Sequence, residues 1–299
     1  MRFTLKNDEL SVVVSSHGGE VCSVTDRKSG REYLWQGVPE IWDEHSPLLF
    51  PFCGRLKNAE YRYQDKVYPM KLHGFLRESD LSAPEQTENS LTFSFSETKE
   101  TLAHYPFPFT LTLLYRLDGR TLSVFATVKN TGDETLPFAF GGHPGISVRM
   151  ENGDFAEGTE LRFTGDVSCA EVFPLMNGSF VSQTGTPFSL PNGVLLLKNA
   201  LFEKDDTVVL KDVPQTATLT QPDGLTVTIS RSENLPYFCL WKSTAERASY
   251  VCLEPWSGTP NDGCSDEILE SRPGLFRLPK GECETFSYSL TFSDRGVKR

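Results

Sequence analysis

Short segments in which apolar and polar residues alternate recur along the whole chain. This period of two is typical of a β-strand that buries one face and exposes the other. The segments that show it, or that form an apolar run of strand length, are Leu91–Phe95, Phe109–Leu117, Thr121–Val128, Ala217–Thr220, Leu225–Ile229, Phe238–Trp241, Tyr250–Leu253 and Thr285–Phe292. The pattern predicts a chain built mainly of strands.

Turn residues separate two pairs of these segments. Asp118-Gly119 stands between one pair, and Pro222-Asp223-Gly224 stands between another. Asp and Gly adopt the backbone angles that tight hairpin turns require. Both pairs are therefore predicted to form antiparallel hairpins.

No internal repeat, low-complexity linker or shift in composition divides the chain, so residues 1–299 are expected to form a single domain. Short strands spaced by about 8–12 residues are typical of sandwiches and barrels. The one fair helix candidate, Asp266–Glu270, is short. We predict an all-β fold, a single large antiparallel β-sandwich.

Composition and charge narrow the range of partners. Hydrophobic residues make up 38% of the 299 residues, with 21 Phe, and a chain of roughly 300 residues buries about three quarters of its unfolded surface. The net charge of −11 disfavours nucleic acid and anionic membranes, because both bind a basic face. We expect a small-molecule partner and a monomer or homodimer.

Targeting signals and cysteine spacing suggest a location. No apolar run approaches the ~20 residues of a membrane span, and the amino terminus lacks the apolar region of a secretory signal. The seven cysteines are odd in number, dispersed and free of CxxC pairs. Reduced thiols, with neither disulfide nor zinc site, are expected. These features predict a cytoplasmic protein.

Two proton-transfer groups lie at the ends of apolar segments. His143 stands in Phe138–Ile146 (FAFGGHPGI), where the two preceding glycines could let the backbone approach a ligand. Glu254 follows Tyr250–Leu253, where a carboxylate is unfavourable unless it is paired or functional. Imidazole and carboxyl groups exchange protons near neutral pH, and Trp256 could stack on a sugar ring. A loop histidine, a salt-bridged glutamate and a core tryptophan are the structural alternatives.

Further candidates are donors that could hold hydroxyl groups. His73 stands in Lys71–Arg77 (KLHGFLR), where Arg77 could clamp an anion. Arg55 and Asn58 present guanidinium and amide donors. Taken alone, each of these residues could equally be structural.

Asp205 and Asp206 interrupt the apolar stretch Leu201–Leu210 and could accept hydrogen bonds from hydroxyls, or form a solvated turn. The remaining histidines lack such a context and are interpreted as structural or surface groups: His17, His45 and His104. The candidate histidines have no second ligand two to four residues away, so no metal site is predicted. Phosphate-binding and dinucleotide-binding glycine patterns are also missing from the sequence.

Taken in order, these motifs resemble those of the aldose 1-epimerase (mutarotase) family, and most closely its LacX-type branch. The matching positions are Arg55 with Asn58, His73-Gly74, His143-Pro144 and Glu254-Pro255. The resemblance extends over nearly the full chain. It implies a galactose mutarotase-like sandwich and an isomerase that acts on a monosaccharide and needs no cofactor.

The resemblance also implies roles for individual residues. Glu254 would be the general base that takes the proton of the anomeric hydroxyl, and His143 the general acid that protonates the ring oxygen. The pyranose would open to the aldehyde, rotate about C1–C2 and close as the other anomer. His73 and Arg55 would hydrogen-bond ring and hydroxyl oxygens.

The sequence departs from the family pattern at two places beside these residues. After the histidine the chain reads HPGISV where galactose mutarotases have HPYFNL, and after the glutamate it reads WSGTPND in place of a Q-x-P-D form. Galactose specificity therefore does not carry over. The sugar-binding aspartate of the family falls on Asp206, with Asp205 as the alternative register.

Two other functions stay open. Arg55, Lys57, Lys71 and Arg77 could bind a phosphate, which would suit a hexose-6-phosphate 1-epimerase. A sugar-binding or sensing β-sandwich without activity is the second. A glycoside hydrolase is disfavoured, because no second carboxylate is clearly partnered with Glu254.

Overall fold

The computed structural model describes residues 1–176, 180–264 and 266–294, and nearly all of its regular structure is β. Each strand predicted from the alternating pattern is present, and every strand pairing within the sheets is antiparallel. Within the described residues, no helix has the length and apolar character of a membrane span. The all-β prediction is confirmed.

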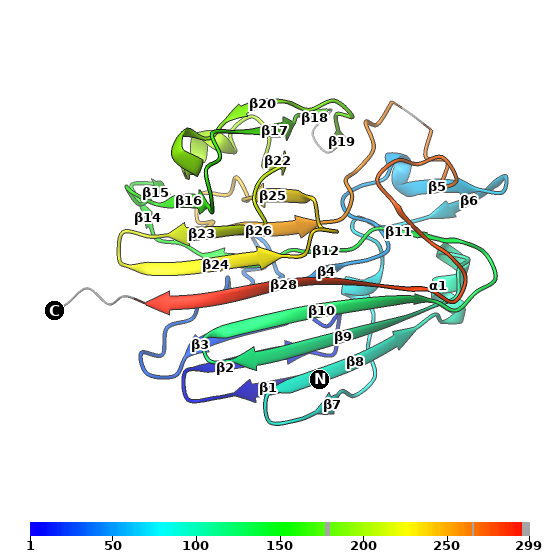
Figure 1. The fold of residues 1–299 in the computed structure, drawn as a ribbon, viewed down its shortest axis with the longest axis horizontal. Helices are drawn as coiled ribbons and strands as arrows, with labels where there is room; N and C mark the ends of the chain where they lie inside the picture. Colours follow the sequence, from blue (N-terminus) through cyan, green and yellow to red (C-terminus); the bar gives the residue numbers. More distant parts are fainter. Residues whose placement is uncertain (177–179, 265, 295–299) are drawn as a thin grey trace.

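The largest sheet of the described residues has nine strands (Figure 1). In spatial order they are β21 (Val194–Leu196), β16 (Glu160–Phe163), β23 (Thr216–Thr220), β24 (Leu225–Arg231), β28 (Cys283–Asp294), β10 (Thr121–Asn130), β9 (Phe109–Asp118), β8 (Ser90–Ser96) and β7 (Glu85–Gln86). Figure 1 shows β28, in red, between β24 and β10. The closing strand thus occupies the middle of this sheet.

A second sheet has eight strands within the described residues. Its order is β20 (Thr186–Ser189), β17 (Cys169–Phe173), β22 (Thr207–Lys211), β25 (Tyr237–Trp241), β26 (Tyr250–Trp256), β12 (Gly141–Gly142) and β4 (Leu48–Leu49), with β13 (Gly145–Ser147) also paired to β26. A three-stranded sheet holds β1 (Arg2–Lys6), β2 (Leu10–Ser15) and β3 (Val21–Asp26).

Small elements connect these sheets. The two-stranded pairs are β5 (Glu60–Tyr63) with β6 (Lys66–Pro69), β11 (Leu136–Phe138) with β27 (Phe276–Leu278), β14 (Met150–Glu151) with β15 (Asp154–Phe155), and β18 (Leu175–Met176) with β19 (Phe180–Val181). The helical elements are α1 (Lys99–His104) and the 3-10 turns η1 (Lys57–Ala59), η2 (Leu76–Glu78), η3 (Pro191–Gly193) and η4 (Asn199–Leu201).

Alternation along the strands separates the two faces of the large sheet. In β28, Phe286, Tyr288 and Leu290 are buried, while the residues between them are more accessible. On the other face, the hydroxyls of Thr121 and Thr291 pair across β10 and β28 at 2.8 Å. The predicted hairpins are confirmed by the pairing of β9 with β10 and of β23 with β24.

Aromatic rings pack the layers together. Phe163 of β16 meets Phe238 of β25 with ring centroids 5.7 Å apart, and Phe3 of β1 meets Phe93 of β8 at 5.7 Å. Burying one such side chain contributes about 1.5–3 kcal/mol. The nine-stranded sheet is therefore one layer of a sandwich, and the eight-stranded and three-stranded sheets share the other.

The predicted helix at Asp266–Glu270 is wrong. This segment pairs with β5 instead, because the Arg62 amide donates to the Glu267 carbonyl at 2.8 Å and the Leu269 amide donates to the Arg62 carbonyl at 2.9 Å. Its backbone groups are thus bonded to a neighbouring strand and not within a helical turn.

The α-helix of the described residues, α1, was not predicted from the sequence. Its first turn nevertheless carries a start signal. Thr98 precedes it, and the Thr98 hydroxyl accepts from the Thr101 amide at 3.1 Å. The Thr101 hydroxyl accepts in turn from the Thr98 amide at 2.8 Å. This reciprocal pair is a capping box.

A buried ion pair holds the loop between β26 and β27. Glu267 and Arg272 are 6% and 4% exposed, and their side chains contact each other. Glu267 also accepts from the Lys57 amide at 3.1 Å, so the pair ties this loop to η1. Arg55 lies just before η1, and Pro260 lies in the loop between β26 and β27. Both residues line a cavity, so the ion pair joins two segments of the cavity wall.

We predict that Glu267→Gln lowers the free energy of unfolding by about 3–5 kcal/mol, because it leaves the Arg272 charge buried without a carboxylate. Chemical denaturation followed by circular dichroism measures the change. The matched control is Asp133→Asn, which breaks an exposed pair with Lys280 and should change the stability far less, because water screens an exposed pair. Equal losses in the two variants would show that the buried pair is not a stabilising tie.

Candidate active site

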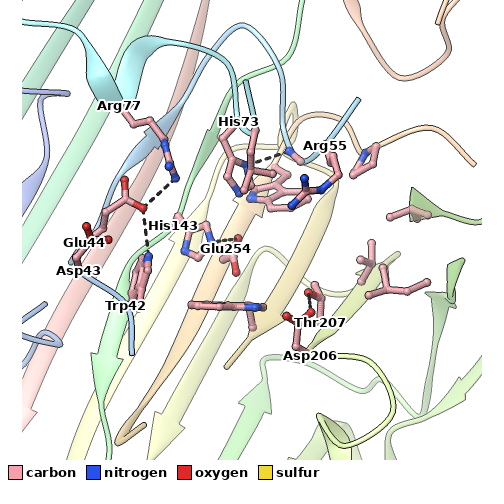
Figure 2. A pocket seen from close by; sticks show the side chains of 18 residues that line it. Trp42, Asp43, Glu44, Arg55, His73, Arg77, His143, Asp206, Thr207 and Glu254 are labelled. Atoms are coloured by element: carbon pink, nitrogen blue, oxygen red, sulfur yellow. Dashed lines mark hydrogen bonds and ion pairs between the residues drawn. The ribbon is translucent and has the colours of Figure 1, made fainter. Parts of the chain in front are cut away.

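A cavity of about 330 Å³ lies against the face of the eight-stranded sheet that is turned away from the core (Figure 2). The residues of this sheet's strands that line it share this face: Thr207 and Val209 of β22, Trp241 of β25, and Glu254 and Trp256 of β26. Their neighbours Leu240 and Leu253 point into the core. Loops cover the cavity and contribute Trp42, Asp43, Glu44, Gly54, Arg55, Leu72, His73, Arg77 and Pro260.

Strand register brings the two proton-transfer residues together. Gly141 pairs with Trp256 and Gly145 pairs with Cys252, so the same register continued between them sets His143 opposite Glu254. Pro144 has no amide hydrogen and interrupts the ladder there. The two residues predicted as acid and base are cross-strand neighbours.

Glycines beside His143 make room for aromatic rings of the protein itself. A Cβ on Gly142 would lie 2.6 Å from the Tyr288 ring, and a Cβ on Gly145 would lie 2.6 Å from the Trp42 ring. The expectation that the glycines before His143 admit a ligand is therefore not what this structure shows. Because these glycines have no side chain, the strand fits between the apolar core and the loops that cover the cavity.

Glu254 and His143 are in direct contact at the cavity wall. The His143 Nε2 atom lies 3.2 Å from the Glu254 Oε2 atom, and the two side chains are 9% and 1% exposed respectively. Among the described residues, the Glu254 oxygens and the His143 Nδ1 atom have no hydrogen-bond partner of good geometry. These buried polar atoms are available to a ligand.

Burial sets the protonation of this pair. It raises the pKa of Glu254 well above the ordinary value, and the negative charge of Asp206 adds to the effect. Burial also lowers the pKa of His143 to about 3. Burial therefore favours the uncharged form of both residues.

His73 is held as a hydrogen-bond donor. Its backbone has φ of 63°, a left-handed conformation that costs a non-glycine residue about 1–2 kcal/mol. The Gly54 amide donates to the His73 Nδ1 atom at 2.9 Å, and the His73 amide donates to the Gly54 carbonyl at 2.9 Å. Burial lowers the pKa of His73 well below its ordinary value. The ring is therefore neutral, with its proton on Nε2.

Arg77 reaches the cavity but is not a free anion clamp. Its Nη1 atom donates to the Glu44 Oε2 atom at 2.9 Å, and the Trp42 indole N–H donates to the same oxygen at 3.2 Å. Figure 2 shows this group on one side of His143. The sequence carried no signal for Trp42 or Glu44, because their loop has no recognisable motif and becomes part of the site only through tertiary contacts.

Three further predicted residues line the cavity: Arg55, Asp206 and Trp256. The Thr207 hydroxyl donates to the Asp206 Oδ1 atom at 2.9 Å, which orients that carboxylate (Figure 2). Trp241 also lines the cavity and was not singled out from the sequence. It ends an apolar strand segment, a position that by itself indicates core and not a site.

Asn58 is placed differently. It lies in η1 with φ of 56°, its side chain is exposed, and it is not among the residues that line the cavity. Asp205 likewise lies outside the lining, and its carboxylate faces Lys204 at 3.9 Å. Of the two registers considered for the aspartate, the lining therefore favours Asp206.

Known proteins resemble this chain over nearly its whole length. The family model for aldose 1-epimerase matches residues 1–291. The chromosomal LacX protein of Lactococcus lactis subsp. lactis is 33% identical over 97% of this chain and 99% of its own length. A galactose mutarotase related enzyme from Lactobacillus acidophilus has a TM-score of 0.91 and 30% identity, with both chains fully covered. A galactose mutarotase-like protein from Lactobacillus casei has a TM-score of 0.91 and 27% identity, covering 98% of this chain and all of that one.

We predict that Glu254 is protonated and His143 is neutral at pH 7. The raised pKa keeps the carboxyl group protonated above its ordinary range, and the lowered pKa of His143 keeps the imidazole uncharged down to about pH 3. Infrared difference spectra should show a protonated carboxyl band that Glu254→Gln removes and the exposed-site control Glu85→Gln retains. An imidazolium signal from His143 at pH 7 in nitrogen NMR would contradict the assignment.

Proposed function

This chain belongs to the aldose 1-epimerase family, and we propose that it interconverts the α and β anomers of an aldohexose by acid–base ring opening. The observation that carries the proposal is the buried contact of 3.2 Å between His143 and Glu254. In a pyranose the anomeric hydroxyl and the ring oxygen are attached to the same carbon. A reaction that moves protons at both oxygens needs its acid and base side by side.

The reaction assigns one group to each oxygen. In the form where the pair carries its proton on the imidazole, Glu254 takes the proton of the anomeric hydroxyl and C1–O becomes a carbonyl. The bond from C1 to the ring oxygen breaks, and His143 protonates that oxygen. After rotation about C1–C2, the same steps in reverse close the ring with the hydroxyl on the other face.

The burial of the site matches this cycle. When the sugar is open, Glu254 is protonated and His143 is neutral, which is the uncharged state that burial favours for the pair. The charged state is the less favourable one in the dry cavity, so ring opening removes two buried charges from the protein. General acid and base catalysis contribute about 10²–10⁴-fold each.

The remaining lining residues suit a neutral sugar. His73 would donate from Nε2 to a ring or hydroxyl oxygen, while Arg55 donates to, and Asp206 accepts from, other hydroxyls. Trp256 and Trp241 offer ring faces for the apolar side of the pyranose. Because Asn58 lies outside the lining, we assign it no contact with the sugar.

The charges of the cavity favour a free sugar over a sugar phosphate. Neither Lys57 nor Lys71 lines the cavity, and Lys71 pairs with Glu78. Arg77 is neutralised by Glu44. Among the described residues that line the cavity, Arg55 is then the cation without an ion-pair partner, and the carboxylates of Asp43 and Asp206 add negative charge.

We predict that Glu254→Gln and His143→Asn each slow anomer exchange by at least ~10². Exchange is measured by NMR on free hexoses, with folding checked by circular dichroism. His17→Asn, at an exposed histidine outside the cavity, is the matched control and should keep the wild-type rate. If wild type binds sugars without accelerating exchange, the non-catalytic sugar-binding function replaces this proposal.

We predict that kcat/KM for a free hexose exceeds that for its 6-phosphate by at least ~10-fold, because Arg55 alone among the described lining cations is left to offset the phosphate charge. A 6-deoxyhexose should be included, since it lacks the 6-hydroxyl without adding charge and so separates the two effects. Preference for the phosphate, lost on Arg55→Ala, would favour the hexose-6-phosphate epimerase instead.

A further inference from the structure

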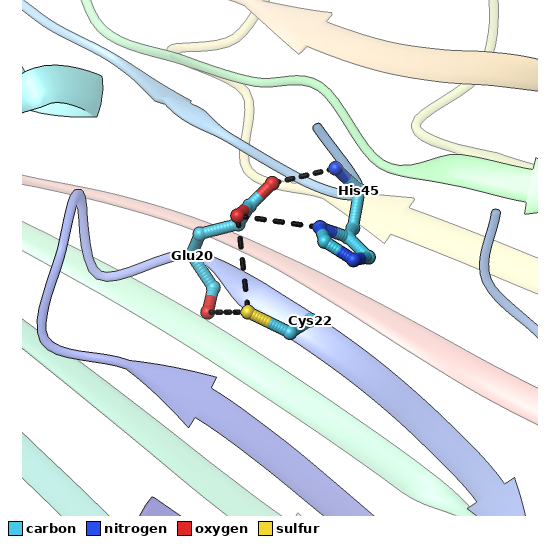
Figure 3. A group of neighbouring side chains, drawn as sticks. All are labelled: Glu20, Cys22 and His45. Carbon is cyan, nitrogen blue, oxygen red and sulfur yellow. Dashed lines mark hydrogen bonds and ion pairs between the residues drawn. The ribbon is translucent and has the colours of Figure 1, made fainter. Parts of the chain in front are cut away.

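A second group of polar side chains lies outside the cavity, where the start of β3 meets the loop before β4 (Figure 3). Glu20, Cys22 and His45 point toward one another there. The Cys22 sulfur lies 3.8 Å from the Glu20 Oε2 atom, and the His45 Nδ1 atom lies 3.4 Å from the same oxygen. Thiol, imidazole and carboxylate are the three ligand types of zinc sites.

Two of the three separations between the ligand atoms are close to those around a tetrahedral metal ion, and all three atoms lie within 4.8 Å of one another. With metal bonds of about 2.3 Å to sulfur and about 2.0–2.2 Å to nitrogen and oxygen, tetrahedral ligands are about 3.6 Å apart for sulfur and oxygen and about 3.3 Å apart for nitrogen and oxygen. The observed separations are 3.8 and 3.4 Å. Small rotations of the side chains would bring all three ligands to a common ion.

Backbone amides orient the Glu20 carboxylate, and the group of three side chains is partly open to solvent. The Glu20 Oε1 atom accepts from the His45 amide at 2.6 Å and from the Ser46 amide at 3.1 Å, which leaves Oε2 for a metal. Among the described residues, the buried His45 Nδ1 atom has no hydrogen-bond partner of good geometry. Glu20 and His45 are 17% and 14% exposed, so a water molecule can complete the shell.

We propose that Glu20, Cys22 and His45 form a binding site for one zinc-class divalent cation, with water as the fourth ligand. The metal would bind through the Cys22 sulfur, the His45 Nδ1 atom and the Glu20 Oε2 atom, joining β3 to the cavity loop. His45 directly follows Trp42–Glu44, which lines the cavity, so metal binding also holds that loop in place. This site is independent of the proposed sugar chemistry.

Metal binding at this site displaces a proton. Burial, together with the charge of Glu20, raises the pKa of Cys22 to about 12, so the thiol is protonated without metal. The bound metal requires the thiolate. Binding therefore takes the proton from the Cys22 thiol, and the affinity rises as the pH is raised.

The test is a Co²⁺ titration of the full chain carrying Cys169→Ser, Cys264→Ser and Cys283→Ser, which removes the exposed thiols. We expect one equivalent to bind with thiolate charge-transfer and tetrahedral absorption bands, and Zn²⁺ to displace it. Cys22→Ser should abolish the charge-transfer band, and His45→Gln should weaken binding by at least ~10-fold. Zn²⁺ at about 100 times its Kd should raise the Tm by roughly 5 °C.

A control separates this site from the active site, where His143, Cys252 and Glu254 are also close enough to hold an ion. Cys252→Ser should keep the bands if the ion binds at Cys22. Bands that survive Cys22→Ser but vanish in Cys252→Ser overturn the proposal, as does the lack of any charge-transfer band in excess Co²⁺. If Cys22→Ser does not fold, unchanged affinity in His45→Gln overturns it independently.

Discussion

The site depends on one antiparallel register, between the strand segment that contains His143 and β26. That register sets His143 opposite Glu254 at 3.2 Å. A shift by one residue would turn one of the two side chains to the opposite face of the sheet, into the core. Close packing holds this register, because Gly142 contacts the Tyr288 ring of the other layer and a residue with a Cβ would not fit there. The packing between the layers of the sandwich therefore also fixes where His143 and Glu254 lie.

Burial gives this pair its chemical character. A carboxyl group and an imidazole that share a dry cavity avoid charge, so the Glu254 pKa rises and the His143 pKa falls. Polar atoms without partners are unfavourable in a folded protein, and here they face a cavity of about 330 Å³. A bound sugar would satisfy them. The sheet tolerates this arrangement because its opposite face carries Leu240 and Leu253 into an ordinary apolar core.

The loops above the sheet are tied to the scaffold by pairs of residues far apart in sequence. His73 and Gly54 exchange two hydrogen bonds, and Glu267 with Arg272 fastens the loop after β26 to η1. Glu20 accepts from the amides of the loop that carries Trp42. Each tie joins a cavity-lining loop to a neighbouring loop or strand. Beside Glu20 lie the Cys22 thiol and the His45 imidazole, so under our proposal a metal ion bound by all three would also join this strand to the loop.

Local pattern was enough to predict many of the longer strands, two hairpins and the all-β class, because alternation depends only on which face of a strand is buried. It was also enough to single out His143 and Glu254, since a histidine stands among glycines and a carboxylate interrupts an apolar segment, where it is unfavourable unless paired or functional. The helix at Asp266–Glu270 was wrong because β5 competes for its backbone groups. Asn58, Trp42 and the Glu20 cluster could not be placed from the sequence. Their positions depend on contacts between loops that have no regular period, and such contacts arise only when the chain is folded.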